Sequence, residues 1–201
     1  MSFWNRYARF YDAEVLRFSR AAYTEVYRLM ARALTKEMRV LELATGTGLI
    51  ALNIADCVSN IEATDYSPKM IETALKKAVP DTVHFSVEDA TALSFDENSF
   101  DAVIISNALH LMPDPSLVLA QIRCVLKPKG LLLAPNFSHG HLKDSKAGLL
   151  GFILRRIGFE TYSQWTPEEY VAFIGEQGFC VKSWHVLKAA FPLVYVEAMM
   201  D

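Results

Sequence analysis

Cysteine, long apolar runs and excess positive charge are all scarce in this chain of 201 residues. Its three cysteines, Cys57, Cys124 and Cys180, lie far apart and form no C-x-x-C pair. That argues against a disulfide framework or a zinc site and favours reduced thiols. No apolar run approaches the ~18–20 residues that a membrane span needs, and the first residues lack the apolar core of a secretory signal. We therefore expect a cytoplasmic protein without a transmembrane segment.

The net charge of −3 makes nucleic acid a poor candidate partner. Residues 1–39 nevertheless hold eight Lys and Arg against four Asp and Glu, a net charge of +4, so the rest of the chain carries −7. Two interpretations stay open. The basic segment is either the solvated face of amphipathic helices or a lid over an anionic or membrane-associated substrate, which would include peripheral membrane contact.

Apolar residues recur at helical spacing through residues 2–35, which contain no glycine or proline. From Met38 onward, short apolar runs alternate with helical ones, the pattern of a parallel sheet covered by helices. A short connection near the C-terminus can join only antiparallel neighbours, so we expect a final hairpin. The chain is thus predicted to be one α/β domain, 1–201, with strands at 39–43, 60–65, 82–87, 100–106, 131–134, 178–187 and 192–200.

The strand Arg39–Leu43 leads into a turn with Gly46 and Gly48, followed by a helix. Such a strand–turn–helix unit is where open α/β sheets bind nucleotide-like ligands. Gly46-x-Gly48-x-x-Ala51, with Asp65 nineteen residues after Gly46, matches a dinucleotide fingerprint. Glu42-x-Ala44-x-Gly46-x-Gly48 equally matches the loop of S-adenosylmethionine (SAM) sites, with alanine at the first glycine.

Glu42 helps to choose between these two ligands, because an unpaired carboxylate at the end of a buried strand is costly. Beside a pyrophosphate it would be repulsive by roughly 4 kcal/mol per charge pair at 4 Å and an effective dielectric near 20. Beside the ammonium and sulfonium of SAM it would be attractive. The alternative is that Glu42 merely pairs with a nearby Arg or Lys.

Two further acidic residues follow the next strands. Asp65 ends the second strand, where its carboxylate can accept hydrogen bonds from both ribose hydroxyls of any adenosine ligand. Glu88-Asp89-Ala90 follows the third strand, where a carboxylate and a backbone N–H can pair with the adenine edge. The alternative for these three residues is a solvated turn.

With these residues the chain resembles the class I SAM-dependent methyltransferases, particularly the quinone-biosynthesis C-methyltransferases and the type 11 group. The resemblance implies a Rossmann-like sheet of seven mostly parallel strands in the order 3-2-1-4-5-7-6, with strand 7 antiparallel. Helices would cover both faces, and an N-terminal helical lid would span residues 1–36. The segments that carry the resemblance are Leu41–Gly48, Asp65–Met70, Glu88–Ala90, Asn98–Val103 and Leu126–Gly130.

The resemblance also implies roles for individual residues around SAM and its product, S-adenosylhomocysteine. Glu42 would face the methionine amino group, and Asn107 would line the methionine end. The other implied cofactor contacts are Ala44, Gly46 and Gly48 in the loop, Asp65 at the ribose, Tyr66 and Met70 beside adenine, Asp89 and Ala90 at its edge, and Tyr7 and Tyr11 in the segment that closes over the cofactor.

Methyl transfer from a sulfonium is an in-line displacement in which positioning supplies much of the acceleration. A general base is needed only if the acceptor must first lose a proton. His110, after the fourth strand, is the candidate base, and a structural role in its loop is the alternative. His139 and His141 have no third ligand nearby in the sequence, so we predict no metal.

Residues 136–165 break the strand–helix alternation, and a loop of this length suggests a substrate-side insertion. Its apolar run 147–154 could line a pocket for a hydrophobic acceptor or simply pack. The sequence therefore predicts a SAM-dependent methyltransferase acting on a small molecule, quinone-like or lipid-like. The alternatives are an NAD-dependent oxidoreductase and a SAM-binding regulator without catalysis.

Overall fold

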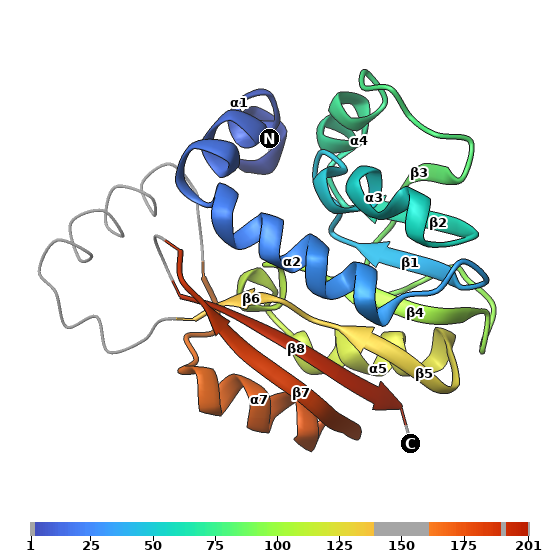
Figure 1. Cartoon of the computed structure of the whole chain (residues 1–201), viewed down its shortest axis with the longest axis vertical. Coiled ribbons are helices and arrows are strands. Elements are labelled where there is room, and N and C mark those ends of the chain that lie inside the picture. Colours follow the sequence, from blue (N-terminus) through green and yellow to red (C-terminus); the bar gives the residue numbers. More distant parts are fainter. Residues whose placement is uncertain (1–2, 139–160, 190–191, 201) are drawn as a thin grey trace, which may run out of the picture.

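The computed structural model describes residues 3–138, 161–189 and 192–200. One mixed sheet of eight strands forms its centre, in the order β3-β2-β1-β4-β5-β8-β6, with β7 paired to the other side of β8 (Figure 1). The strands are β1 Arg39–Leu43, β2 Asn60–Asp65, β3 Val83–Val87, β4 Phe100–Ile105, β5 Leu126–Leu133, β6 Asn136–Phe137, β7 Phe179–Leu187 and β8 Leu193–Met200.

The predicted strand order, 3-2-1-4-5-7-6, is confirmed. The sixth and seventh predicted strands are β7 and β8, and β8 lies next to β5 with β7 at its other side. The first five strands are parallel, and β8 lies antiparallel between β5 and β7. The eighth strand is β6, a two-residue pairing of Asn136 and Phe137 with β8 at the start of the predicted insertion. Most of that insertion, with His139, His141 and the apolar run 147–154, lies outside the described residues.

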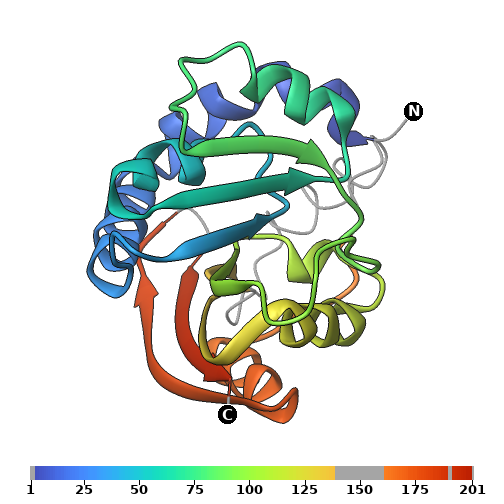
Figure 2. The same cartoon turned by 90° about the vertical axis from the view of Figure 1, so that its right-hand side faces the viewer.

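Helices cover both faces of the sheet, as the two views in Figures 1 and 2 show. Buried residues of α5 and α7 pack with one set of strand side chains, and those of α2 and α3 pack with the alternate set. In β1, Leu41 and Leu43 face α5 and α7, while Val40 faces α2 and α3. The helices are α1 Phe3–Phe18, α2 Arg20–Ala33, α3 Leu49–Ile54, α4 Pro68–Ala74, α5 Pro115–Val125 and α7 Pro167–Glu176, with short 3₁₀ turns η1 Ala55–Cys57 and η2 Leu109–Leu111.

Helix starts follow local capping chemistry. The Asp114 side chain accepts a hydrogen bond from the Leu117 N–H at 3.0 Å and caps α5, which begins with a proline. Thr166 and Glu169 form a reciprocal capping box at the start of α7. These contacts fix where both helices begin.

One local prediction is wrong. The fifth strand was predicted at 131–134, but β5 already begins at Leu126. β4 pairs Phe100 with Leu126 and then Ala102 with Leu131, so the four residues Lys127–Gly130 form an irregularity inside the strand. Lys129 there has φ +62°, in the left-handed region.

α1 and α2 meet at Ser19, so the N-terminal helical prediction resolves into two helices. α1 lies beside α4 near the carboxyl ends of the first strands, whereas α2 runs across the sheet (Figure 1). None of the helices in the described ranges is both long and apolar enough to cross a membrane. All three cysteines are free thiols.

Candidate cofactor and acceptor site

The loop between β1 and α3 has three residues with positive φ, Ala44 at +52°, Gly46 at +58° and Gly48 at +78°. At Gly48 a Cβ atom would lie 2.5 Å from Cζ of Phe85, so no side chain fits between this loop and β3. At Gly46 the nearest atom to such a Cβ would be Cε1 of Tyr11, at 3.7 Å. Gly46 is therefore required by conformation, and Gly48 by both conformation and space.

Glu42 is 1% exposed and lies on the α2–α3 face of the sheet, directly beneath this loop. Its Oε2 accepts hydrogen bonds from the Thr45 hydroxyl at 2.8 Å and from the Ala51 N–H in α3 at 2.9 Å. Burial raises the pKa of Glu42 to about 8 despite these two bonds. Among the residues that the structure describes, no Arg or Lys pairs with it.

Asp65 joins the ends of β1 and β2. Its Oδ2 accepts a hydrogen bond from the Gly46 N–H and its Oδ1 from the Ser67 N–H, both at 2.8 Å. Burial raises the pKa of this carboxyl, and the two backbone donors oppose that rise. A carboxylate offers about four lone-pair positions, so Asp65 can shape the loop and still accept from ligand hydroxyls.

The predicted adenine-side residues sit in contrasting surroundings. Asp89 is exposed, and its Oδ1 accepts from the N–H and hydroxyl of Thr91 at 2.9 and 2.6 Å, bonds that lower its pKa. Ala90 packs against the α5–α7 face. Tyr66 is 71% exposed, whereas Met70 is 2% exposed. Both residues follow β2, and only Tyr66 is open to solvent.

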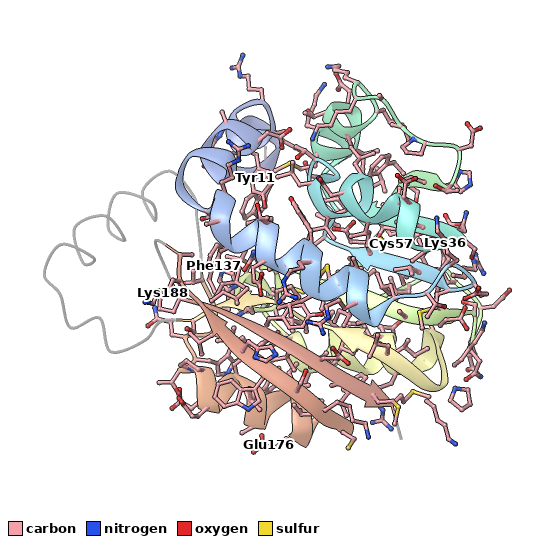
Figure 3. All side chains as sticks on the ribbon, in the orientation of Figure 1. Tyr11, Lys36, Cys57, Phe137, Glu176 and Lys188 are labelled. Atoms are coloured by element: carbon pink, nitrogen blue, oxygen red, sulfur yellow. The ribbon has the colours of Figure 1, made fainter. Side chains whose placement is uncertain are left out.

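Three polar side chains meet between α1, α2 and the end of β4. Tyr11 reaches from α1 toward the glycine loop (Figure 3) and lies beside Tyr23 of α2. Asn107, with φ +53°, donates from Nδ2 to the Tyr23 hydroxyl at 3.0 Å. Its Oδ1 is buried and accepts no hydrogen bond within the described residues, which leaves an acceptor for a ligand donor. Burial is the main cause that raises the pKa of both tyrosines.

Side chains also tie α1 to the loops of the sheet. Lys77 pairs with Asp12 at 2.6 Å and donates to the Thr47 carbonyl at 2.7 Å, while the Thr47 hydroxyl donates to Asp12. The Ser67 hydroxyl bonds to the Asn5 side chain at 2.5 Å. Near them Tyr7 packs edge-on against Tyr11, with ring centres 6.2 Å apart.

The remaining candidate, His110, lies in η2 and is 5% exposed. Its Nδ1 is 2.9 Å from Oδ1 of Asn136. Its backbone carbonyl accepts from the N–H groups of Tyr162 and Ser163 at 2.9 and 3.3 Å.

The structure thus brings Glu42, Gly46, Asp65, Tyr11 and Asn107 to one edge of the sheet, with His110 three residues beyond Asn107. Sequence reasoning missed Tyr23, Lys77 and Asn136. For Tyr23 the sequence offered only its helical spacing. Asn136 comes two residues after the end of the predicted strand 131–134, and that position could have marked it as a site residue.

Comparison with known proteins shows which proteins the chain resembles. The family described as "Methyltransferase domain" matches residues 41–134. A demethylmenaquinone methyltransferase from Renibacterium salmoninarum is 34% identical over 147 residues, which are 73% of this chain and 60% of that protein. A ubiquinone/menaquinone biosynthesis C-methyltransferase from Desulfotalea psychrophila is 39% identical over 94 residues, 46% of this chain and 38% of that protein. The chain thus spans well under two thirds of the length of these relatives.

Solved structures agree on the fold. One chain of the complex between the Haloferax volcanii Trm112 methyltransferase activator and a methyltransferase superposes with a TM-score of 0.80. The match covers 100% of this chain and 99% of that one at 17% identity. Residues 41–134 therefore match the methyltransferase domain family, and the whole chain shares the fold of the solved structure.

Proposed function

We propose that the protein transfers a methyl group from SAM to a small-molecule acceptor. The observation that carries the proposal is the buried Glu42 beneath the glycine loop, without a cationic partner in the described chain. An ammonium group beside Glu42 would favour the ionised carboxylate and pair with it, whereas a pyrophosphate would oppose that ionisation. The NAD-dependent alternative is therefore disfavoured by the same residue.

The chain's own residues fit the cofactor. Glu42 would face its amino group, Asp65 the ribose hydroxyls, and the Oδ1 of Asn107 a donor at the methionine end. Asp89, Ala90, Tyr66 and Met70 would surround the adenine. When bound, SAM supplies an electrophilic methyl group, and the chain's part is to orient the acceptor and exclude water.

We place the acceptor between α1, α2 and the far side of β4. Aromatic side chains gather there, with Tyr11 beside Tyr23 and the Tyr23 and Tyr27 rings 6.0 Å apart. Two relatives are named for quinone substrates, which supports a hydrophobic, quinone-like acceptor. In this proposal α1 is the lid, residues 136–165 border the acceptor, and the free thiols suit a cytoplasmic setting.

The test is production of S-adenosylhomocysteine from SAM across a panel of hydroxyquinones, phenols, lipids and amines. We expect turnover with aromatic, apolar members and none with the polar amines. Tyr23→Phe, which removes one hydroxyl from the acceptor side, should reduce turnover while SAM affinity changes little. Binding of SAM with no turnover on any class of acceptor would favour a non-catalytic SAM-binding protein instead.

A further inference from the structure

Glu42 and Asp65, the two carboxyls at the cofactor edge, use their oxygens differently. Each Asp65 oxygen accepts one backbone N–H, as suits an ionised carboxylate. Both hydrogen bonds to Glu42 reach the same oxygen, Oε2, from the Thr45 hydroxyl and the Ala51 N–H. Within the described residues its Oε1 takes part in no hydrogen bond. A neutral carboxyl has one oxygen that accepts and one that carries the proton, so this geometry fits a proton on Oε1.

Among the described residues, the elements packed around Glu42 supply no cation that pairs with it. Its sheet neighbours are Ala63 of β2 and Ile104 of β4, and α3 carries no ionisable side chain. Three phenol groups from α1 and α2 lie within electrostatic range, those of Tyr11, Tyr23 and Tyr27. Burial is the main cause that raises the pKa of each, which keeps them neutral. Lys77 reaches the glycine loop, but it is paired with Asp12.

A buried carboxyl without a cation is held in its neutral form, because the charged form loses its hydration. Glu42 is 1% exposed, and burial is the largest of the causes that raise its pKa to about 8. The negative charge of Asp65 acts in the same direction, whereas the donors Thr45 and Ala51 oppose it. At neutral pH the Glu42 carboxyl is therefore mostly protonated.

We propose that Glu42 exchanges this proton for the ammonium group of the cofactor. The O–H bond at Oε1 breaks, the proton passes to solvent, and the electron pair stays on Oε1, which then accepts an N–H of the ammonium. An opposite charge within about 4–6 Å favours the ionised carboxyl and so offsets its burial. This inference rests on the proposed function and adds that SAM binding releases a proton, which makes its affinity depend on pH.

The first test measures the released proton. Calorimetric titration with SAM, repeated in buffers that differ in ionisation enthalpy, gives the number of protons exchanged on binding. At pH 6.5 we expect release of about one proton for each SAM bound, and the affinity should rise about tenfold from pH 6 to pH 7. Binding of SAM with no proton released and no change in affinity overturns the exchange and leaves the proposed function standing.

Three ligands show whether the ammonium is the group responsible. S-adenosylhomocysteine keeps the ammonium but has no sulfonium, and methylthioadenosine has neither. We expect S-adenosylhomocysteine to release as much proton as SAM does, and methylthioadenosine to release none. Equal release with all three ligands, or release with SAM alone, contradicts an exchange at the ammonium.

Glu42→Gln, which cannot ionise, assigns the proton to this residue. Release by SAM and S-adenosylhomocysteine should fall to near zero, and the affinity should no longer rise between pH 6 and pH 7. The matched control is Glu37→Gln, at an exposed position before β1, which should leave the release unchanged. Release that persists in Glu42→Gln overturns the assignment. Should this variant not fold, the comparison of the three ligands on the wild type still decides.

Infrared spectroscopy separates this inference from the proposed function. At pH 6.5 the wild type without ligand should show the C=O stretch of a neutral carboxylic acid that Glu42→Gln lacks. If the two spectra show no such difference, Glu42 is already ionised, and the exchange is overturned whether or not SAM binds. If the band is present and SAM does not bind, the proposed function is overturned instead.

Discussion

The two sides of the candidate site are held together by different forces. On the cofactor side, buried carboxylates bind backbone N–H groups, as Asp65 does with Gly46 and Ser67 and Glu42 with Ala51. On the acceptor side, α1 is attached mainly through side chains, including the partly exposed pair of Lys77 and Asp12. A hydrogen bond to a backbone N–H depends on one side chain, the carboxylate. A bond between two side chains depends on both residues, so both can be replaced together in a relative.

This difference explains how the two sides can serve different purposes. A loop whose backbone is fixed by buried hydrogen bonds keeps one conformation, which suits a constant cofactor. A helix fastened by side chains can change its inner surface, and its attachment costs little to release, because partly exposed ion pairs contribute about 1 kcal/mol or less. The following experiments test this contrast, from the largest expected effect to the smallest.

Glu42 should make the stability of the cofactor side depend on pH. Its pKa is about 8 in the folded protein against an ordinary value of 4.5, so the unfolded chain loses its proton first. The free energy of unfolding should then fall as pH rises from about 4.5 to 8, by at most about 5 kcal/mol. Glu42→Gln, which stays neutral, should remove this slope in urea denaturation at pH 5, 6.5 and 8.

The exposed Glu37 provides the matched control. A hydrogen bond from the Thr35 hydroxyl lowers its pKa, so its contribution to stability is present above its unfolded pKa and is lost only in acid. Glu37→Gln should therefore leave the slope between pH 5 and 8 intact. Parallel curves for wild type and Glu42→Gln would mean that Glu42 is ionised in the folded chain.

Gly48→Ala should destabilise the fold by about 4 kcal/mol, combining overpacking of about 1–3 kcal/mol against Phe85 with about 1–2 kcal/mol of left-handed strain. Gly46→Ala carries the same strain but makes only an ordinary van der Waals contact, since its nearest neighbour is 3.7 Å away. It should cost only about 1–2 kcal/mol. Chemical denaturation measures both, and Phe85→Leu should rescue part of the Gly48→Ala loss but none of the Gly46→Ala loss.

Asp65→Ala should weaken binding of SAM and S-adenosylhomocysteine about 100-fold, roughly 2.7 kcal/mol, because a charged acceptor for two ribose hydroxyls is lost. The exposed Asp89 is the comparison, and Asp89→Ala should cost about tenfold in affinity. Calorimetric titration gives both values. A larger loss at Asp89 than at Asp65 would reverse the contrast between buried and exposed carboxylates.

The smallest effect is expected in the attachment of α1. Lys77→Gln should lower overall stability by about 1 kcal/mol or less, yet it should speed hydrogen exchange of the α1 amides relative to those of the sheet. Lys76→Gln removes an exposed pair between Glu72 of α4 and Lys76 just beyond its end, and should leave α1 exchange unchanged. Equal protection of α1 in wild type and Lys77→Gln would show that other contacts hold the helix.

Local patterns in the sequence were sufficient for most of the fold. Alternation of strands and helices predicted a parallel sheet with a final hairpin, and the resemblance to the methyltransferases implied its strand order. In the structure Ser67, Asp114 and Thr166 cap the starts of three helices. Local reasoning failed at the start of the fifth strand, which was predicted at residue 131. Leu126 already pairs with Phe100 of β4, before the irregularity at Lys127–Gly130, and that long-range pairing has no local signal.

The candidate site was predictable only where its residues lie at strand ends. Glu42, Gly46, Asp65 and Asp89 occupy such ends, so topology alone brings them to one edge. Tyr23 is 84 residues from its partner Asn107, and Lys77 meets Asp12 across a similar distance in the chain. Those pairings depend on where α1 and α2 settle on the sheet, which no local spacing encodes.

The central claim is that the edge built from Glu42 and Asp65 takes SAM rather than a dinucleotide. Calorimetric titration of the protein with SAM and, separately, with NADH tests it directly. The account predicts a saturable heat of binding for SAM that Asp65→Ala weakens, and no binding of NADH. Binding of NADH without binding of SAM would contradict the account and restore the dehydrogenase interpretation.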